Sequence, residues 1–406
     1  MKYDIIIIGG GISGLYNYYH LINTNNKVIL FEKNDYFGGR ILNQSVVNIN
    51  HPTGAARFNL NHKLVIKLLK EFHLLDFRKD HPISASMQFI DCKDKFSNHN
   101  LKNGFILIKK VIKHSKKLKL NLKLYTFKEI AAMILTKKEL DYMLVASGYS
   151  GQLKHMNAYD AMHLFSNGIR DDILYYNGKY DLLINKIVDY LKCNHANLKL
   201  NTEIKYIKYH KKNNLYQVNY NNKIIFGEKI IFSMPKQNLL KFNILKTIAP
   251  ILNKSIYCKS LCRVYALFDK KDIWYQHIKD KLVVDNALRY IIPLGRENPL
   301  IMISYTDDKY TQFWKSLQNS QTKLKKAIVN LIYSALKMHI ESPLKVLVYH
   351  WDYGVGVWNK NIDSELVSNY LLNPLPNIYI SGENYSLNQS WVEGALETSN
   401  KVLKMI

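Results

Sequence analysis

The chain has 406 residues and a formal net charge of +25 at pH 7, and 47% of its residues are hydrophobic. It is long enough for two domains around a large core, and no apolar run reaches the roughly 18 residues of a membrane span. Only seven of the 57 basic residues are arginine, which reads phosphates and bases better than lysine, so nucleic-acid binding is not expected. The four cysteines are too scattered for a disulfide framework and indicate reduced thiols.

Codon composition can explain the positive net charge. Lysine, asparagine, isoleucine and tyrosine have AT-rich codons, so an AT-rich genome gives a basic chain without selection for an acidic partner. Such a genome suits a large DNA virus or an AT-rich protist. Only Met1 and Lys2 precede the first predicted strand, so we expect no signal peptide. The predicted compartment is the cytoplasm, or the virion if the source is viral, and a homo-oligomer is compatible with the sequence.

The N-terminal part of the chain alternates between strand and helix. An apolar run at Asp4–Ile8 predicts a buried strand, a glycine turn follows, and Ser13–Thr24 has helical spacing. Val28–Glu32 predicts a second strand, and helical spacing returns between Leu64 and Phe72. This is the β-α-β order of a dinucleotide-binding unit.

The segment that follows, 77–173, is mostly helical. Within it, a lysine-dense stretch at 109–123 indicates a solvated helix and loop, or else a docking patch for an anionic partner. Thr136 followed by Glu139 is the signature of a capped helix.

The second half mixes hairpins with helices. A helix at Asp181–Leu191 precedes short β segments separated by "KKNN" and "NN", which predict antiparallel hairpins before residue 240. The segment 246–345 mixes strands with a helix near 322–339, and the segment 346–406 returns to turn, strand and helix. Such alternation predicts two domains built from segments that cross between them.

The stretch "GGGISG" predicts a dinucleotide site. Gly9 permits the tight turn, Gly11 lets a pyrophosphate approach, and Gly14 lets the helix pack on the strand. The N-terminus of that helix, with Ser13, then faces the phosphates. Glu32 ends the second strand, where a carboxylate binds ribose hydroxyls and repels the 2′-phosphate of NADP.

NAD and FAD both fit this pattern, and other segments favour FAD. Gly39 gives a second close backbone approach, and Arg40 can reach a diphosphate oxygen. Near the other end, Gly382 and Glu383 follow a predicted strand, and Glu383 can hold ribityl hydroxyls. A helix starting near Trp391–Gly394 would stabilise the negative charge that builds on a reduced flavin.

These blocks, with "TGAARF", "LNTEI" and "KIIFSMP" between them, resemble the flavin-containing amine oxidase family, which includes monoamine and polyamine oxidases and related histone demethylases. The resemblance implies an α/β fold of the amine oxidase and p-hydroxybenzoate hydroxylase type, in which a Rossmann-type FAD-binding domain is interleaved with an α+β substrate domain. It places the discontinuous FAD-binding domain at 1–76, 174–245 and 346–406, and the substrate-binding domain at 77–173 and 246–345.

The resemblance also implies which residues lie along FAD. Gly54 and Ala55 would follow the flavin, the main chain of Ile204 would read adenine, and Val392 would present its N–H to the pyrimidine end of the ring. Val357 stands where some members tether flavin through a cysteine, so non-covalent FAD is expected. Further cofactor residues expected from the same blocks are Lys33, Ala56 and Arg57.

The chemistry implied is hydride removal from a carbon next to nitrogen, delivered to flavin N5, with O2 reoxidising the flavin. It needs a small-molecule amine held uncharged against the ring. Trp358 and Trp391 would be the facing aromatic rings of the amine slot. Arg263 stands where much of the family has a lysine that helps oxygen react, and Lys259 would need a four-residue shift. Because arginine cannot give up its proton, the identity of the acceptor stays open.

Two other functions are compatible with the sequence. One is a flavin desaturase or oxidase acting on C–C or C–O bonds, as in relatives that handle porphyrinogens or carotenoids, which Arg263 favours and the paired tryptophans disfavour. The other is a structural or interaction protein that keeps FAD for stability. No metal is expected, because His155, Asp160 and His163 have no third ligand at metal spacing.

Overall fold

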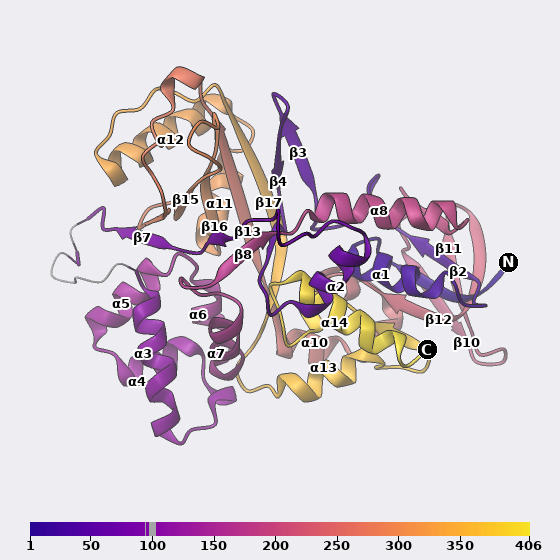
Figure 1. Cartoon of the computed structure of the whole chain (residues 1–406). Coiled ribbons are helices and arrows are strands. Elements are labelled where there is room, and N and C mark those ends of the chain that lie inside the picture. Colours follow the sequence, from indigo (N-terminus) through magenta and orange to yellow (C-terminus); the bar gives the residue numbers. More distant parts are fainter. Residues whose placement is uncertain (94, 97–102) are drawn as a thin grey trace.

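Two β-sheets organise the structure, a computed structural model that describes residues 1–93, 95–96 and 103–406 (Figure 1). The first sheet has seven strands. In spatial order they are β10 (Tyr206–His210), β11 (Leu215–Tyr220), β12 (Lys223–Phe232), β1 (Lys2–Ile8), β2 (Val28–Phe31) and β9 (Asn197–Lys199), with β18 (Ile378–Ile380) paired to β12. β1 is parallel to its neighbours β12 and β2, which makes it a central strand.

The isoleucine run of β1 is buried on both faces of this sheet, as expected for a parallel strand. Because side chains alternate along a strand, Ile5 and Ile7 pack with one group of helices while Ile6 and Ile8 belong to the core on the other face. The helices on the Ile5 and Ile7 side are α1 (Ile12–Leu21), α2 (Lys63–Glu71), α8 (Tyr180–Cys193) and α14 (Val392–Leu403).

The second sheet has six strands. In spatial order they are β17 (Lys345–Trp358), β13 (Ile256–Leu267), β16 (Leu300–Asp307), β15 (Tyr290–Pro293), β14 (Lys281–Val284) and β7 (Met87–Ile90). Val264 packs with Trp314 of α11 (Lys309–Leu317) and Leu324 of α12 (Gln321–Leu336) on one face. Odd-numbered residues of β13, among them Arg263, therefore face the other side, where Tyr265 and Leu267 pack with Val46.

A group of helices lies beside the second sheet (Figure 1). They are α3 (Phe105–Ser115), α4 (Phe127–Ile134), α5 (Lys137–Ala146), α6 (Gly151–His155) and α7 (Ala158–Asn167). The capping box predicted at Thr136 and Glu139 is confirmed, with both reciprocal bonds formed. In the lysine-dense stretch, Lys109 lies 2.9 Å from Asp172 and Lys110 lies 2.7 Å from Glu139, so these two lysines pair within the chain.

The remaining elements are short. β3 (Asn43–Val46) and β4 (Ile49–Pro52) form a hairpin, while β5 (Arg57–Phe58), β8 (Leu174–Asn177) and β6 (Ile83–Ser84) form a small sheet. The other helices are α9 (Lys236–Leu239), α10 (Ala249–Ser255) and α13 (Ser364–Leu372). In the part of the chain that the structure describes, no helix has the length and apolar character needed to cross a bilayer. Nor do three His, Cys, Asp or Glu side chains of the described residues gather as metal ligands.

The predicted hairpins are confirmed. The β10–β11 and β11–β12 connections turn at asparagines with positive φ, namely Asn214, Asn221 and Asn222. In contrast, 345–358 was expected to belong mostly to the FAD-binding domain, yet it forms β17 and pairs along its length with β13 of the second sheet. Sequence patterns do not reveal this long-range pairing of the two strands.

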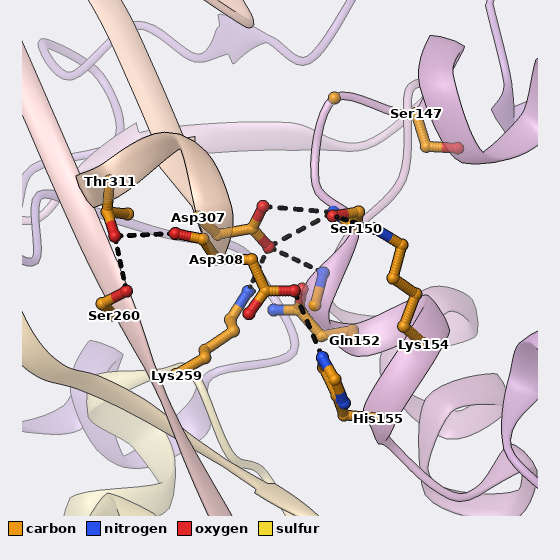
Figure 2. Close-up of polar contacts among 12 residues, drawn as sticks. Ser147, Ser150, Gln152, Lys154, His155, Lys259, Ser260, Asp307, Asp308 and Thr311 are labelled. Carbon is orange, nitrogen blue, oxygen red and sulfur yellow. Dashed lines mark hydrogen bonds and ion pairs between the residues drawn. The ribbon is translucent and has the colours of Figure 1, made fainter. Parts of the chain in front are cut away.

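A buried ion pair joins the second sheet to the helical group (Figure 2). Lys259 Nζ lies 2.9 Å from Asp307 Oδ2, and their side chains are 1% and 2% exposed. Asp307 also accepts hydrogen bonds from the backbone N–H groups of Ser150 and Gly151, where α6 begins. Lys259 donates a second bond to Gln152 Oε1 at 2.6 Å. Each charge is therefore paired and hydrogen-bonded, which burial requires.

Replacing Lys259 with methionine is expected to destabilise the fold by about 3 kcal/mol, because it leaves Asp307 as a buried charge without its cation. The double variant Lys259→Met, Asp307→Asn should lose less than the sum of the two single losses, by at least about 1 kcal/mol. Urea denaturation of the three variants measures this coupling. Strict additivity of the two losses would show that the pair contributes nothing.

Candidate functional site

A cavity of about 920 Å³ lies between the two sheets, with Ile8 and Phe31 of the first sheet and Leu261 and Tyr305 of the second on its walls. Most residues predicted to form the site line this cavity. They are Gly9, Gly11, Ser13, Glu32, Lys33, Gly39, Arg40, Gly54, Ala55, Ala56, Arg57, Ile204, Arg263, Gly382, Glu383, Trp391 and Val392. Gly14 and Trp358 are the two predicted residues that do not line it.

The glycine turn between β1 and α1 has the geometry that its sequence predicts. Gly9 has φ +114°, and a Cβ there would lie 2.3 Å from Ser233 O. A Cβ on Gly14 would lie 1.9 Å from Gly9 O, so Gly14 permits the close packing of helix on turn without touching the cavity. Gly11 differs, because its Cβ would meet nothing closer than Gly38 O at 3.9 Å. The space in front of Gly11 is open cavity, and no side chain caps the N-terminus of α1.

Glu32 is fixed at the end of β2 by the backbone of the same region. Its Oε2 accepts a hydrogen bond from Gly10 N at 2.7 Å, and its Oε1 accepts one from Asn34 N at 2.9 Å. The side chain is buried but remains on the cavity wall. Since a carboxylate has about four lone-pair sites, acceptor capacity is left for ligand hydroxyls.

Glu383 and Arg40 form an ion pair on the cavity wall, with Arg40 Nη1 2.8 Å from Glu383 Oε2. Glu383 Oε1 accepts from Gly356 N at 3.1 Å and from Ser390 N at 2.7 Å. Arg40 also donates to Gly354 O at 2.7 Å. The two residues expected to contact diphosphate and ribityl groups thus lie together and hold three segments of the wall in place.

The N-terminus of α14 points a polar, uncapped end at the cavity. Trp391 is the N-cap and makes no side-chain cap hydrogen bond, and Val392 follows it on the wall. Within the described residues, the buried Ser390 Oγ and Trp391 Nε1 have no hydrogen-bond partner. Glu393 does not neutralise this end, because its carboxylate accepts the N–H groups that open α2. The site therefore retains donors for a ligand that carries acceptors or partial negative charge.

Trp391 closes one end of the cavity within an aromatic cluster. Its ring stacks on Tyr175 with centroids 5.8 Å apart and an interplanar angle of 24°, and His62 lies 4.7 Å away on another side. The Tyr175 hydroxyl donates to Gly168 O at 2.9 Å, which fixes the ring. These contacts hold Trp391 in one orientation at the wall.

Trp358 does not face Trp391 across the cavity, which corrects the predicted aromatic slot. Its side chain is fully buried outside the lining, and its Nε1 donates to Ser386 O at 3.0 Å. Trp351, on the same strand, lines the cavity instead and donates from Nε1 to Thr53 O at 2.8 Å. In the register of β17 with β13, Trp351 is paired with Leu261 and Trp358 with Ile256, which lie on opposite sides of β13, so the two tryptophans lie on opposite sides of the sheet. The irregular register of β17 between Trp351 and Val355 is not visible in the sequence.

Arg263 and Lys259 both reach the cavity from β13, but in different electrostatic states. Lys259 is neutralised by Asp307. Arg263 is 6% exposed, donates to Pro52 O at 3.0 Å and lies over the ring of Tyr305 at 4.7 Å. Burial opposes its charge, but Tyr305 and Tyr265 outweigh that effect and raise the pKa of Arg263. Arg263 is therefore a permanent cation in the wall.

Sequence reasoning also missed the tyrosines on the walls. Tyr149 precedes α6 and Tyr305 lies on β16, and their rings meet at 5.3 Å in an edge-to-face arrangement. Nothing local distinguishes them from the other tyrosines of a chain that contains 29. Only the register of β16 against β13, which sets Tyr305 beside Arg263, reveals them.

His62 is expected to make stability depend on pH. Burial lowers its pKa to about 4, and its Nδ1 accepts from Asn59 N, so it is neutral in the folded state. The unfolded chain binds a proton near pH 6.5, so this part of the stability is complete above pH 6.5 and is lost as pH falls towards 4, by about 3 kcal/mol. Urea midpoints between pH 7.5 and 4.5 should fall less steeply for His62→Phe. Parallel pH curves for the two proteins would contradict the assignment.

Comparisons with known proteins agree with this architecture. Residues 7–72 match the model of the NAD(P)-binding Rossmann-like domain. A protein of Acanthamoeba polyphaga mimivirus, uncharacterized protein R188, is 25% identical over 487 residues, which cover 99% of this chain and 93% of that protein. Wild-type putrescine oxidase bound to putrescine superposes with a TM-score of 0.78 at 14% identity, covering 100% of this chain and 99% of that one. A mutant of putrescine oxidase from a redesign of its cofactor binding gives 0.79 at 14% identity, covering 100% and 98%. The chain therefore has the fold of putrescine oxidase, with a Rossmann-like segment at its N-terminus, as its resemblance to the flavin-containing amine oxidases implied.

Proposed function

We propose that the protein is an FAD-dependent oxidoreductase that oxidises a C–N bond of a small-molecule amine, with non-covalent FAD and with O2 as the acceptor. The observation that carries the proposal is a single cavity with two different ends. One end has the glycine turn and Glu32, and the other has the aromatic wall at Trp391. The shared fold with putrescine oxidase, one structure of which is bound to putrescine, supports it.

The residues present fit FAD. Open space in front of Gly11 suits a pyrophosphate, and the uncapped N-terminus of α1 offers it N–H donors. Glu32 would bind ribose hydroxyls, and the N-terminus of α14 with Ser390 would face the polar edge of the flavin. No cysteine is found among the described residues that line the cavity, which favours non-covalent binding. Bound FAD would supply a hydride acceptor.

The charges on the aromatic end favour a monoamine over a polyamine. Arg57 and Arg263 line the cavity there, and Lys259 is already paired. Asp352 is the one carboxylate that the second sheet contributes to the described lining, and it is 57% exposed and 2.6 Å from Lys315. A polyamine dication would find no unpaired buried carboxylate on the described part of this wall, so the desolvation of its second charge would not be offset.

A second candidate function is oxidation of a C–C or C–O bond in a substrate without an amine. Two observations favour it: Trp358 is absent from the cavity wall, and Arg263 is a fixed cation there. Both candidates use the same cofactor site, so only a panel of substrates separates them.

Anaerobic mixing of the FAD-loaded protein with primary and secondary monoamines is expected to bleach the visible flavin band, with diamines and polyamines at least about tenfold less effective at equal concentration. Trp391→Ala should lower the second-order rate of reduction by about 100-fold without releasing FAD, because the amine loses the surface that orients it. Trp391→Phe is the matched control and should retain most of the rate. Bleaching by no amine, with the band intact, would reject amine oxidation and favour the second candidate.

Gly11→Ala is expected to weaken FAD binding by at least about tenfold while leaving the fold intact, because its methyl group would enter the space proposed for the pyrophosphate. Fluorescence titration of the apoprotein with FAD measures the affinity, and the thermal midpoint of the apoprotein checks folding. Unchanged affinity in a folded Gly11→Ala protein would place the dinucleotide elsewhere.

A further inference from the structure

An amine substrate arrives mainly as an ammonium ion near neutral pH, and it must lose a proton before a hydride can leave its carbon. The carboxylates on the described cavity wall do not serve this purpose. Glu32 and Glu383 are held by backbone N–H groups at the polar end. Glu203 is 48% exposed and lies 3.7 Å from Lys205, and Asp352 is exposed and paired with Lys315. The proton acceptor is therefore to be sought among the other titratable groups of the wall.

Tyr305 lies beside Arg263 on that wall. It is paired with Arg263 across the β13–β16 ladder, and the Arg263 guanidinium carbon lies 4.7 Å from the centre of its ring. Lys259 and Arg57 act on the same phenol at longer range. Arg263 and Arg57 therefore favour a negative charge on the Tyr305 oxygen, whereas Asp307 offsets much of the effect of Lys259.

The phenols packed around Tyr305 are in a different state. Tyr149 meets it edge-to-face at 5.3 Å, and burial raises the pKa of Tyr149. Tyr290, 6.5 Å away on β15, donates its hydroxyl to Ser147 O, and Tyr265 on β13 donates to Pro52 O. Burial raises the pKa of both.

One more cation lies beside Tyr305 in the sheet. The Arg289 guanidinium is committed to the backbone carbonyls of Val145, Gly148 and Val284. At Tyr305 burial is the largest single influence and acts to raise the pKa, but Arg263, Lys259 and Arg57 together outweigh it, and the net shift of the pKa is downward. Among the described phenols around this point, Tyr305 is the one whose ionised form is stabilised.

We propose that the phenolate of Tyr305, positioned beneath Arg263, accepts a proton from the substrate ammonium before oxidation. The N–H bond breaks, an O–H bond forms on Tyr305, and the nitrogen keeps its lone pair as the free amine. No electrons are transferred in this step. The inference rests on the proposed amine oxidation, for which Tyr305 would be a catalytic residue and Arg263 its positioning residue.

The first test follows flavin reduction against pH under anaerobic conditions. In the wild type the rate should rise with pH through the ionisation of Tyr305 and then level off, since the phenolate is the active form. In Tyr305→Phe the rising limb should move up to the pKa of the free amine, and the rate at neutral pH should fall by about 100-fold. Arg263→Gln, which removes the positive charge beside Tyr305, should shift the rising part of the pH–rate curve to higher pH. Arg263→Lys, which keeps a positive charge, should shift it most of the way back. Tyr149→Phe is the matched control and should leave the limb in place.

The second test needs no turnover. Titration of the folded protein, followed by the ultraviolet absorbance of phenolate, should show one tyrosine that ionises before the rest. That early step should be lost in Tyr305→Phe and should move to higher pH in Arg263→Gln. FAD content and thermal midpoint establish that each variant is folded.

The outcomes distinguish failure of the role proposed for Tyr305 from failure of the proposed amine oxidation. An unchanged pH limb in Tyr305→Phe, or an early phenolate step that survives this substitution, overturns the role of Tyr305 and leaves amine oxidation in place. A wild-type flavin that no amine reduces overturns the proposed function, and the base role with it, whatever the phenolate titration shows. A shifted limb together with the loss of the early phenolate step supports both.

Discussion

Glu383 is a buried carboxylate that holds three walls of the cavity at once. It receives the Arg40 guanidinium from the loop after β2, the Gly356 N–H from β17, and the Ser390 N–H from the segment before α14. Burying one carboxylate costs several kcal/mol, and each hydrogen bond to a charged group contributes about 1.5–3 kcal/mol, so only a full set of donors makes the site stable. Because those donors come from segments near opposite ends of the chain, the cavity exists only where both sheets meet.

The two ends of the cavity differ in the source of their positive charge. At the polar end, backbone N–H groups and helix termini supply partial positive charge in fixed directions, which suits phosphates and the polar edge of a flavin. At the aromatic end, full cationic charges on Arg57 and Arg263 stand beside phenols and indoles. The positive charges of Arg57 and Arg263 favour the neutral form of an amine held there over its ammonium form. Under the proposed function, the polar end would suit an anionic cofactor and the aromatic end would disfavour a cationic substrate.

Much of this fold could be predicted from interactions between residues that are close in the sequence. The glycine turn, the capping box at Thr136 and the asparagine turns between β10, β11 and β12 depend on neighbours within a few residues, and they appear where the sequence indicates them. The site was predictable at its polar end for the same reason, since Gly9, Gly11 and Glu32 belong to one β-α-β unit.

The aromatic end was predictable only in part, because long-range pairing builds it. The prediction for Trp358 was wrong because the pairing of β17 with β13 decides which side of the strand faces the cavity. Tyr305 was missed because its partner Arg263 lies on another strand, distant in the sequence, and only the register of the two strands brings them together.

The first and last helices of the chain depend on each other. α1 packs against α14, and the Ser399 hydroxyl donates a hydrogen bond to Ser13 O across 386 residues of sequence. The helix that would face the phosphates is therefore supported by a helix that is synthesised long after it. During synthesis α1 acquires its final neighbours only after α14 has been made. Assembly of the cofactor site is for that reason a late event in folding.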